Sequence, residues 1–582
     1  MYLKQSPRKE TGRNYLIIAK KVRNPDTGKY YDATIENLGY LDELQKEYPD
    51  PITHFRAVAR KMTEEENASR KVTLSIDMEE ELPEDSDARK NLGYAAILKI
   101  YHELDLPRFF KNKARHEGFE YNTNSIMTLL VVSRILSPGS KKKAYGEKGR
   151  YFERFDFSLA DVYRALTHFA SVAQDAQRHI NESIAARYGR DTNTIYYDVT
   201  NFYFEVDKED ELRKRGVSKE HRKDPIVQMG LAMDADGVPL HYELFSGNTQ
   251  DKSTFRSVIG EVRRNYETGR IVVVADMGII TGDNIYYLVG GEKREKALNG
   301  YVFSFSVNGG TDKFQKYVLD RSEYSGWDGK PVRDDADFMI KSRMMAREIN
   351  VTMDSGKTDT KTVYEKQVVF WSKKYADKAK ADREKVLLKA MDMVENPSKY
   401  NKSNSYGAAK YVKNIEYDKK TGEVITAGKH AFLDLEKIQA EEKFDGYYAI
   451  VTSELEMSDQ EIVDTYRGLW EIEETFRITK GTLEARPVYV SLEDRINAHF
   501  LSCFIALVIM RLLQKQTGRR YSCEKIVECL NRISCSNEQD NIYLFNYRSK
   551  MSNDIGKALG VDFSKKRLRL SEVKNIIANS KK

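Results

Sequence analysis

The feature that most constrains the fold of this sequence is an aspartate inside its most strand-like segment. Asp198 lies within IYYDVTNFYF (195–204), a run of β-branched and aromatic residues that predicts a buried strand. An ionised carboxylate in a buried strand costs several kcal/mol unless its charge is compensated. Either Asp198 caps a turn at the end of the strand, or it belongs to a site that binds a cation.

A second aspartate ends an apolar segment further along the chain. Asp276 follows IVVVA (271–275), and ligands of open α/β sheets bind at the carboxyl ends of strands. The alternative is an N-cap for the next helix, because aspartate is common at that position. This position alone does not separate the two interpretations.

A third acid lies on a helix predicted over about 459–480. A capping-box pattern, S-D-Q-E, marks the start of this helix. Tyr466, Glu473 and Lys480 are spaced by seven residues, so they share one face of the helix, with Arg477 near them. A solvated face with salt bridges has the same pattern.

The order of the three acids along the chain, strand, strand and helix, favours a site. A hairpin signal at Asp234–Gly237 and a helical pattern over 252–268 separate the first acid from the second. The predicted fold class is α/β, a ribonuclease-H-like mixed sheet with helices, in which the three acids converge at one edge. Three carboxylates there can hold two divalent ions about 4 Å apart for phosphoryl transfer. Hard oxygen ligands favour Mg²⁺, with Mn²⁺ as a substitute.

The 582 residues of the chain predict several domains. They are an N-terminal β-containing basic module (1–75), a helical domain (90–190), the first part of the ribonuclease-H-like core (191–290), a β-rich insertion domain (291–445), the second part of the core (446–518) and a helical, basic C-terminal tail (519–582). The acidic stretch 78–87 is the predicted linker between the first two domains.

These residues resemble the DDE transposases of bacterial insertion sequences, in particular the group with a β-rich insertion between the second Asp and the Glu. The signature of that group is Y-x2-R-x3-E-x6-K, and Tyr466, Glu473 and Lys480 match its spacing. Leu469 stands at the Arg position of the signature, and Arg467 is the nearest substitute. Further blocks that resemble the family are FSGNTQDKSTF (245–255), VVADMG (273–278), FDGYYAIVTS (444–453), the segment 466–490 and RINAHF (495–500).

The resemblance implies an enzyme that cleaves transposon ends and joins their 3′-hydroxyls to target DNA by two-metal phosphoryl transfer. Its catalytic residues and metal ligands would be Asp198, Asp276 and Glu473. Its DNA contacts near the cut would be Tyr466, Arg467, Arg477 and Lys480. The expected partner is double-stranded DNA, both inverted-repeat ends and target, bound by a homodimer.

The same resemblance implies a hairpin on the cut end, in which a flipped base stacks on an aromatic residue of the insertion. Trp371, in VVFWSKK (368–374), is the candidate for that contact. Packing in the core of its own strand is the alternative.

The net charge of +6 does not by itself indicate a nucleic-acid-binding protein. The basic residues are instead gathered in clusters, with seven Lys or Arg in the first 25 residues. Other basic clusters lie at 213–223, 373–389 and 564–570. Each cluster is a candidate contact to DNA phosphates, or merely a solvated face.

No segment predicts a membrane or secreted protein. The longest apolar run, Phe500–Met510, is too short to span a bilayer, and the N-terminal residues contain no apolar leader. The four cysteines form no C-x-x-C pair. We therefore expect a cytoplasmic, nucleoid-associated bacterial protein with no membrane partner.

Two other functions fit the pattern. One is a ribonuclease-H-like endonuclease without strand transfer, against which the insertion and the basic flanking modules argue. The other is a catalytically silent DNA-binding protein derived from a transposase, which the three intact acids disfavour.

Overall fold

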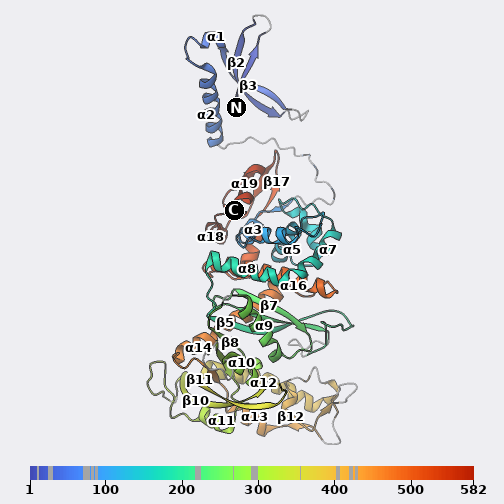
Figure 1. Ribbon diagram of the computed structural model, residues 1–582, viewed down its shortest axis with the longest axis vertical. Coiled ribbons are helices and arrows are strands. Elements are labelled where there is room, and N and C mark those ends of the chain that lie inside the picture. Colours follow the sequence, from blue (N-terminus) through green and yellow to red (C-terminus); the bar gives the residue numbers. More distant parts are fainter. Residues whose placement is uncertain are drawn as a thin grey trace. The chain divides into compact units, whose positions relative to one another are not determined.

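The chain forms two compact units, Met1–Ser86 and Asp87–Lys582, in a computed structural model (Figure 1). The structure describes residues 1–8, 12–23, 30–69, 79, 81, 84, 89–216, 224–266, 268–289, 299–333, 335–353, 355–400, 405, 407–417, 424–425 and 430–582. The predicted acidic linker falls almost entirely outside these residues.

The first unit contains a three-stranded antiparallel sheet in the order β1 (Tyr2–Pro7), β2 (Asn14–Arg23) and β3 (Tyr30–Tyr40). Two helices follow, α1 (Leu41–Leu44) and α2 (Pro51–Ser69). Leu16 and Ile18 alternate along β2 and are fully buried, as expected for a strand with one covered face. The turn predicted at 24–29 lies outside the described residues.

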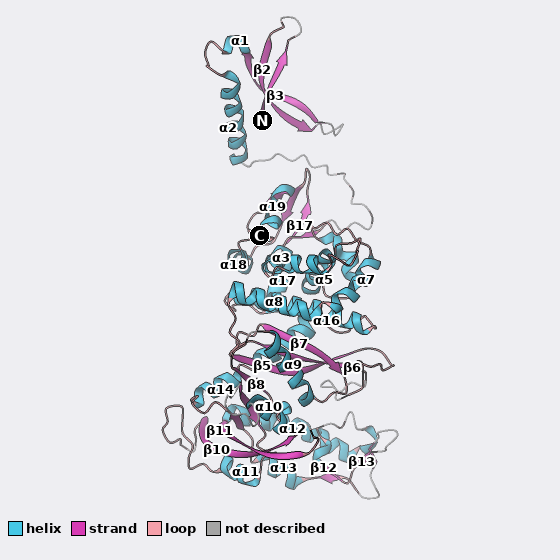
Figure 2. Cartoon of the chain, viewed as in Figure 1, coloured by secondary structure: helices cyan, strands magenta, loops and turns pink. Residues whose placement is uncertain are grey.

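The second unit is built on an eight-stranded mixed sheet (Figure 2). In sheet order, its strands are β10 (Phe338–Thr352), β11 (Thr358–Ser372), β16 (Tyr447–Thr452), β9 (Asn299–Phe305), β8 (Ile271–Ala275), β5 (Thr194–Tyr203), β6 (Ile226–Met233) and β7 (Pro239–Ser246). The strands β5, β6 and β7 form an antiparallel meander, and β8 and β9 run parallel to β5. The other three strands are antiparallel to their neighbours. The protein is therefore a mixed α/β structure.

Helices cover both faces of this sheet because its strands carry apolar side chains on both sides. On β5, Ile195 and Tyr197 face a cluster that includes α9 (Asp251–Asn265) and α10 (Gly282–Val289). Tyr196, between them, faces the opposite cluster. Two-sided burial is typical of sheets with parallel crossovers.

The segment predicted as an insertion contributes strands to the same sheet. β9, β10 and β11 all lie within 291–445, and β11 pairs with β16 of the resumed core. Around them lie α11 (Asp312–Leu319), α12 (Lys373–Glu395) and α13 (Leu435–Glu442), with the short strands β12 (Val412–Lys413), β13 (Glu416–Tyr417), β14 (Val424–Ile425) and β15 (Phe432–Leu433). The boundary predicted between residues 290 and 291 lies outside the described residues.

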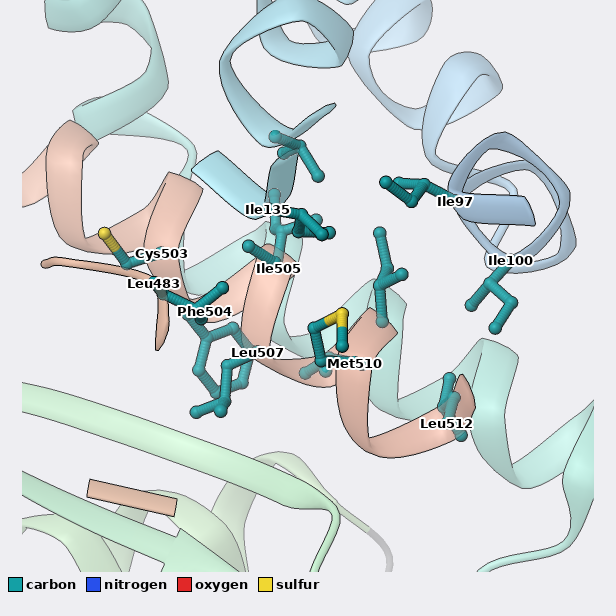
Figure 3. Packing of buried hydrophobic residues seen from close by; sticks show 14 of the residues in the cluster. Ile97, Ile100, Ile135, Leu483, Cys503, Phe504, Ile505, Leu507, Met510 and Leu512 are labelled. Carbon is teal, nitrogen blue, oxygen red and sulfur yellow. The ribbon is translucent and has the colours of Figure 1, made fainter. Parts of the chain in front are cut away.

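A helical layer with one large hydrophobic core lies against the sheet. Its helices are α3 (Tyr94–Glu103), α4 (Leu106–Lys113), α5 (Thr123–Leu136), α6 (Lys141–Gly146), α7 (Leu159–Ser171), α8 (Ala173–Tyr188) and α16 (Glu493–Gln516). Side chains of α16, including Phe504, Leu507 and Met510, pack in one cluster with Ile97 and Ile135 (Figure 3). In the described part of the chain, α16 alone is long and apolar enough to cross a membrane, but 94% of its most apolar window is buried. It is the central helix of this core.

The C-terminal tail, predicted as helical, also contains strands. It consists of α17 (Cys523–Arg532), β17 (Ser534–Asn537), β18 (Ile542–Phe545), α18 (Lys550–Leu559), β19 (Arg567–Arg569) and α19 (Leu570–Ser580). The strands form a sheet in the order β19-β18-β17-β4, in which β4 is Lys90–Asn91. Sequence patterning missed them because Cys535 pairs with Lys90, a partner more than 400 residues away. All four cysteines are buried and reduced.

Candidate active site

Asp198 and Asp276 are brought together by the register of two parallel strands. Tyr196 of β5 lies opposite Val274 of β8, so the same register continues to Asp198 and Asp276. The backbone of Asp276 remains extended, with φ −81° and ψ 165°. Side chains in register on parallel strands point to the same face, here the face of Tyr196 and Val274. Both carboxylates therefore leave the same face of the sheet, Asp198 from the middle of β5 and Asp276 directly after the end of β8.

Asp276 is held by three hydrogen bonds to one oxygen. The Ser304 hydroxyl donates to Oδ1 at 2.6 Å, the Met277 amide donates at 2.7 Å and the Tyr466 hydroxyl donates at 3.4 Å. Asp276 also caps the short 3₁₀ helix Met277–Ile279, so the capping alternative holds as well. Among the described residues, no donor reaches Oδ2. This oxygen is available for a ligand.

The helix that carries Glu473 crosses close to β5. The predicted helix 459–480 is divided into α14 (Asp459–Arg467) and α15 (Trp470–Arg477), followed by a π-helical turn (Ile478–Thr482). The capping box at its start is confirmed. A Cβ on Gly468 would lie 2.0 Å from the Tyr196 hydroxyl, and that hydroxyl donates to the Thr465 carbonyl at 3.1 Å. This contact of Tyr196, two residues before Asp198, fixes the point at which the helix is divided.

Tyr466 contacts Asp276 from this helix. Burial and the charge of Asp276 raise the pKa of the Tyr466 phenol. The pKa of Tyr448, on β16, is also raised, by burial first and then by the charges of Tyr375, Asp276 and Glu473. Glu473 is exposed. Asp276 and Glu473 are thus both among the charged groups that raise the pKa of this phenol.

The three carboxylates do not form a closed cluster. Within the described residues, no group of three or more His, Cys, Asp or Glu side chains lies close enough to hold a metal ion. Asp198 and Asp276 nevertheless fit a hard cation in chemistry, since both are carboxylates and one Asp276 oxygen receives no donor from the described part of the chain. Glu473 has to approach them to complete the expected set.

The residues expected to contact DNA differ in their surroundings. The Lys480 ammonium lies 5.6 Å from the centre of the Phe202 ring, on the same face of β5 as Asp198. Arg477 is 75% exposed and lies 3.7 Å from Glu474. Arg467 pairs with Asp464 at 3.2 Å. Both arginines are therefore on the outer side of the helix.

Trp371 and Leu469 lie apart from the acids. Trp371 packs with Val369 in a cluster on the opposite face of the sheet, and its indole donates to the Asp445 carbonyl at 3.0 Å. This is the core-packing alternative. Leu469, at the Arg position of the family signature, is 7% exposed and packs in the main core. That position faces away from solvent in this chain.

Sequence reasoning missed Ser304, Tyr196 and Tyr448 as neighbours of the acids. Ser304 lies on β9, whose register places Phe303 opposite Ala275, and therefore Ser304 opposite Asp276. The serine within the apolar segment YVFSF (301–305) was the available signal. Without the strand order, nothing indicated which acid it would meet.

Comparison with known proteins gives one family match. Residues 3–72 match the N-terminal domain of the IS1634 family transposases. No curated protein matches the chain. A solved structure of the piggyBac transposase in a synaptic complex with hairpin DNA is similar over 84% of this chain and 85% of that chain, with 7% identity and a TM-score of 0.33. A similarity this low shows neither a shared fold nor a shared function. The family match supports an insertion-sequence transposase.

Proposed function

We propose that this protein is a metal-dependent DNA transposase that cleaves transposon ends and joins their 3′-hydroxyls to target DNA. Its catalytic residues and metal ligands are Asp198, Asp276 and Glu473. The observation that carries the proposal is the register of β5 and β8, which aligns Asp198 with Asp276 on one face. The transposase match over residues 3–72 is independent support, because it lies in the other unit.

The strand order supports a ribonuclease-H-like core. The meander β7-β6-β5 is followed by the parallel strands β8 and β9, with α9 and α10 in the two connections. Such an order places the ends of β5 and β8 at adjacent positions at one edge. Asp198 lies in the middle of β5 and Asp276 directly follows β8, so the first two acids are neighbours across this strand pair.

The residues of this chain have separate tasks in the proposed reaction. Ser304 and Tyr466 hold Oδ1 of Asp276 and so direct Oδ2 outward. Glu473 approaches from the covering helix. Lys480, beside Phe202, is placed to bind a DNA phosphate as a cation. Bound Mg²⁺ or Mn²⁺ would supply activation of the attacking hydroxyl and stabilisation of the leaving oxygen.

Double-stranded DNA is the proposed partner, with a homodimer holding the two ends. In-line transfer at a two-metal site suits a phosphodiester, because the two ions stabilise its attacking and leaving oxygens. The basic α12, Arg467 of α14 and Arg477 of α15 are candidate contacts beyond the cut. Residues 217–223 of the predicted basic segment lie outside the described residues.

The separation of the three acids is also compatible with two other functions. The three acids are not close enough, in the described part of the chain, to hold a metal as they stand. In a catalytically silent DNA-binding protein the three acids would stay apart permanently. An endonuclease without strand transfer would share the site and lack only the joining step.

A single assay separates the three functions. A labelled duplex carrying the DNA that flanks the gene is incubated with the full chain and Mg²⁺, with a supercoiled plasmid as target. Strand nicks followed by joined products support the transposase. Nicks alone indicate an endonuclease, and bound but uncut DNA indicates the silent protein. A chelator and Asp276→Asn serve as controls.

A further inference from the structure

Arg511 on α16 is a buried guanidinium with five hydrogen bonds. Its side chain is 5% exposed. The acceptors are the Gly237 carbonyl at 3.0 Å, Glu474 Oε2 at 3.0 Å, Gln514 Oε1 at 2.9 Å, the Glu471 carbonyl at 3.1 Å and Glu471 Oε2 at 2.5 Å. A guanidinium has five N–H donors, so the bonding of this one is complete.

These bonds join three elements that are distant in sequence. Glu471 and Glu474 belong to α15, Arg511 and Gln514 to α16, and Gly237 to the turn between β6 and β7. Gly237 has φ +66°, and a Cβ there would lie 2.8 Å from Glu471 Oε2. The turn therefore approaches the ion pair as closely as glycine allows.

Glu473 lies in sequence between Glu471 and Glu474, the two carboxylates that bond to Arg511. A helix turns about 100° per residue, so Glu473 points roughly 200° away from Glu471 and 100° away from Glu474. Since Arg511 draws both flanking carboxylates to the core side, Glu473 is turned outward, where it is exposed. Arg519 adds a second bond to Glu471, at 2.6 Å.

We propose that Arg511 is a positioning residue that fixes the rotation of α15 and so aims Glu473 at Asp198 and Asp276. This inference rests on the proposed function, because it gives Glu473 a task. Arg511 itself does not touch DNA or the reacting atoms. Its effect is on geometry, and an error of about 1 Å at a catalytic group can lower a rate roughly a hundredfold.

The test uses the full chain and separates positioning from folding. Arg511→Met alone would leave the buried Glu471 and the partly buried Glu474 without this guanidinium, which destabilises a protein strongly. The decisive variant therefore combines Arg511→Met with Glu471→Gln and Glu474→Gln. This triple variant removes the hydrogen bonds of Arg511 to α15 and the buried charges together. Arg511→Lys keeps the charge but loses the five-bond geometry. Arg520→Gln is the matched control, because Arg520 borders the same region and pairs with Asp554 instead.

Two readouts are measured, cleavage kinetics and amide hydrogen exchange of residues 470–477. In the triple variant we expect kcat to fall roughly a hundredfold with KM for DNA unchanged, and the α15 amides to exchange faster. Arg511→Lys should lie between the triple variant and the wild type, and Arg520→Gln should match the wild type. If the triple variant does not fold, Arg511→Lys decides by the same two readouts.

The failure of this inference is distinguishable from the failure of the proposed function. A folded triple variant with wild-type kcat and wild-type exchange overturns the role of Arg511. If the wild type itself does not cleave DNA, the proposed function fails. The role of Arg511 in fixing α15 is then tested by amide hydrogen exchange alone. Faster exchange of the α15 amides in the triple variant supports this role, and unchanged exchange overturns it.

Discussion

Ser304 and Asp276 lie opposite each other on adjacent parallel strands, and the Ser304 hydroxyl donates to Asp276 Oδ1 at 2.6 Å. Ser304 is 4% exposed, so water does not readily replace this bond. The contact fixes the rotation of the Asp276 carboxyl group and leaves Oδ2 directed outward. A residue that orients a metal ligand in this way typically changes metal affinity or activity 10–100-fold when it is lost.

Ser304→Ala should therefore raise the Mg²⁺ concentration needed for half-maximal cleavage by about tenfold or more. The measurement is a Mg²⁺ titration of cleavage rate. Ser306→Ala is the control, because the Ser306 hydroxyl accepts from the Gly309 amide and not from the site. An unchanged titration midpoint in Ser304→Ala would show that Asp276 is oriented by other contacts.

Lys141 makes stability depend on pH. Burial lowers the pKa of Lys141 from 10.5 to about 7, and its Nζ lies 2.8 Å from His499 Nδ1. Between about pH 7 and pH 10.5 the unfolded chain binds more protons than the folded one, so the free energy of unfolding rises with pH over this range. As pH falls toward 7, that contribution is lost.

The check is chemical denaturation at several pH values. In Lys141→Met the rise between pH 7 and 10.5 should be much smaller than in the wild type. Lys142→Met, on the exposed side of the same helix, should keep the wild-type slope. Equal slopes for all three proteins would contradict a neutral buried Lys141.

Leu469→Arg should destabilise the protein rather than restore a phosphate contact. Leu469 is buried in the main core, and an unpaired guanidinium there costs several kcal/mol. The free energy of unfolding is the measurement, with Trp470→Arg as control because Trp470 is 55% exposed. A stable Leu469→Arg variant with tighter DNA binding would show that this position faces the DNA.

Trp371→Ala should lower stability by about 3 kcal/mol through lost packing, while cleavage by the folded variant stays near the wild-type rate. The reason is that Trp371 packs on the face opposite the acids and bonds to the Asp445 carbonyl. Denaturation and cleavage are measured on the same preparation. A stable variant that no longer cleaves would favour the stacking role instead.

Local patterns predicted the individual elements of the site well. A run of β-branched and aromatic residues identified β5, a continuous apolar segment identified β8, and the capping box located the start of α14. Helical spacing placed Tyr466 on one face with Glu473 and Lys480, and the structure brings Tyr466 to Asp276. These features depend on contacts within a few residues, which a sequence records directly.

Features that depend on distant pairing were beyond the sequence. The division of the helix at Gly468 follows from its contact with Tyr196, and the orienting role of Ser304 follows from the strand order. The five acceptors of Arg511 come from three elements. In each case the decisive partner lies 25 or more residues away, and no local periodicity indicates it.

The most direct test of the account is cleavage of labelled flanking DNA by the wild type, Asp198→Asn, Asp276→Asn and Glu473→Gln with Mg²⁺. Each of the three changes removes a charge and keeps the shape of the side chain. We expect each to lower the cleavage rate about a thousandfold or more, since metal stabilisation of the transition state contributes several kcal/mol, while DNA binding remains. A variant of any one acid that cuts DNA at the wild-type rate would contradict the proposed active site.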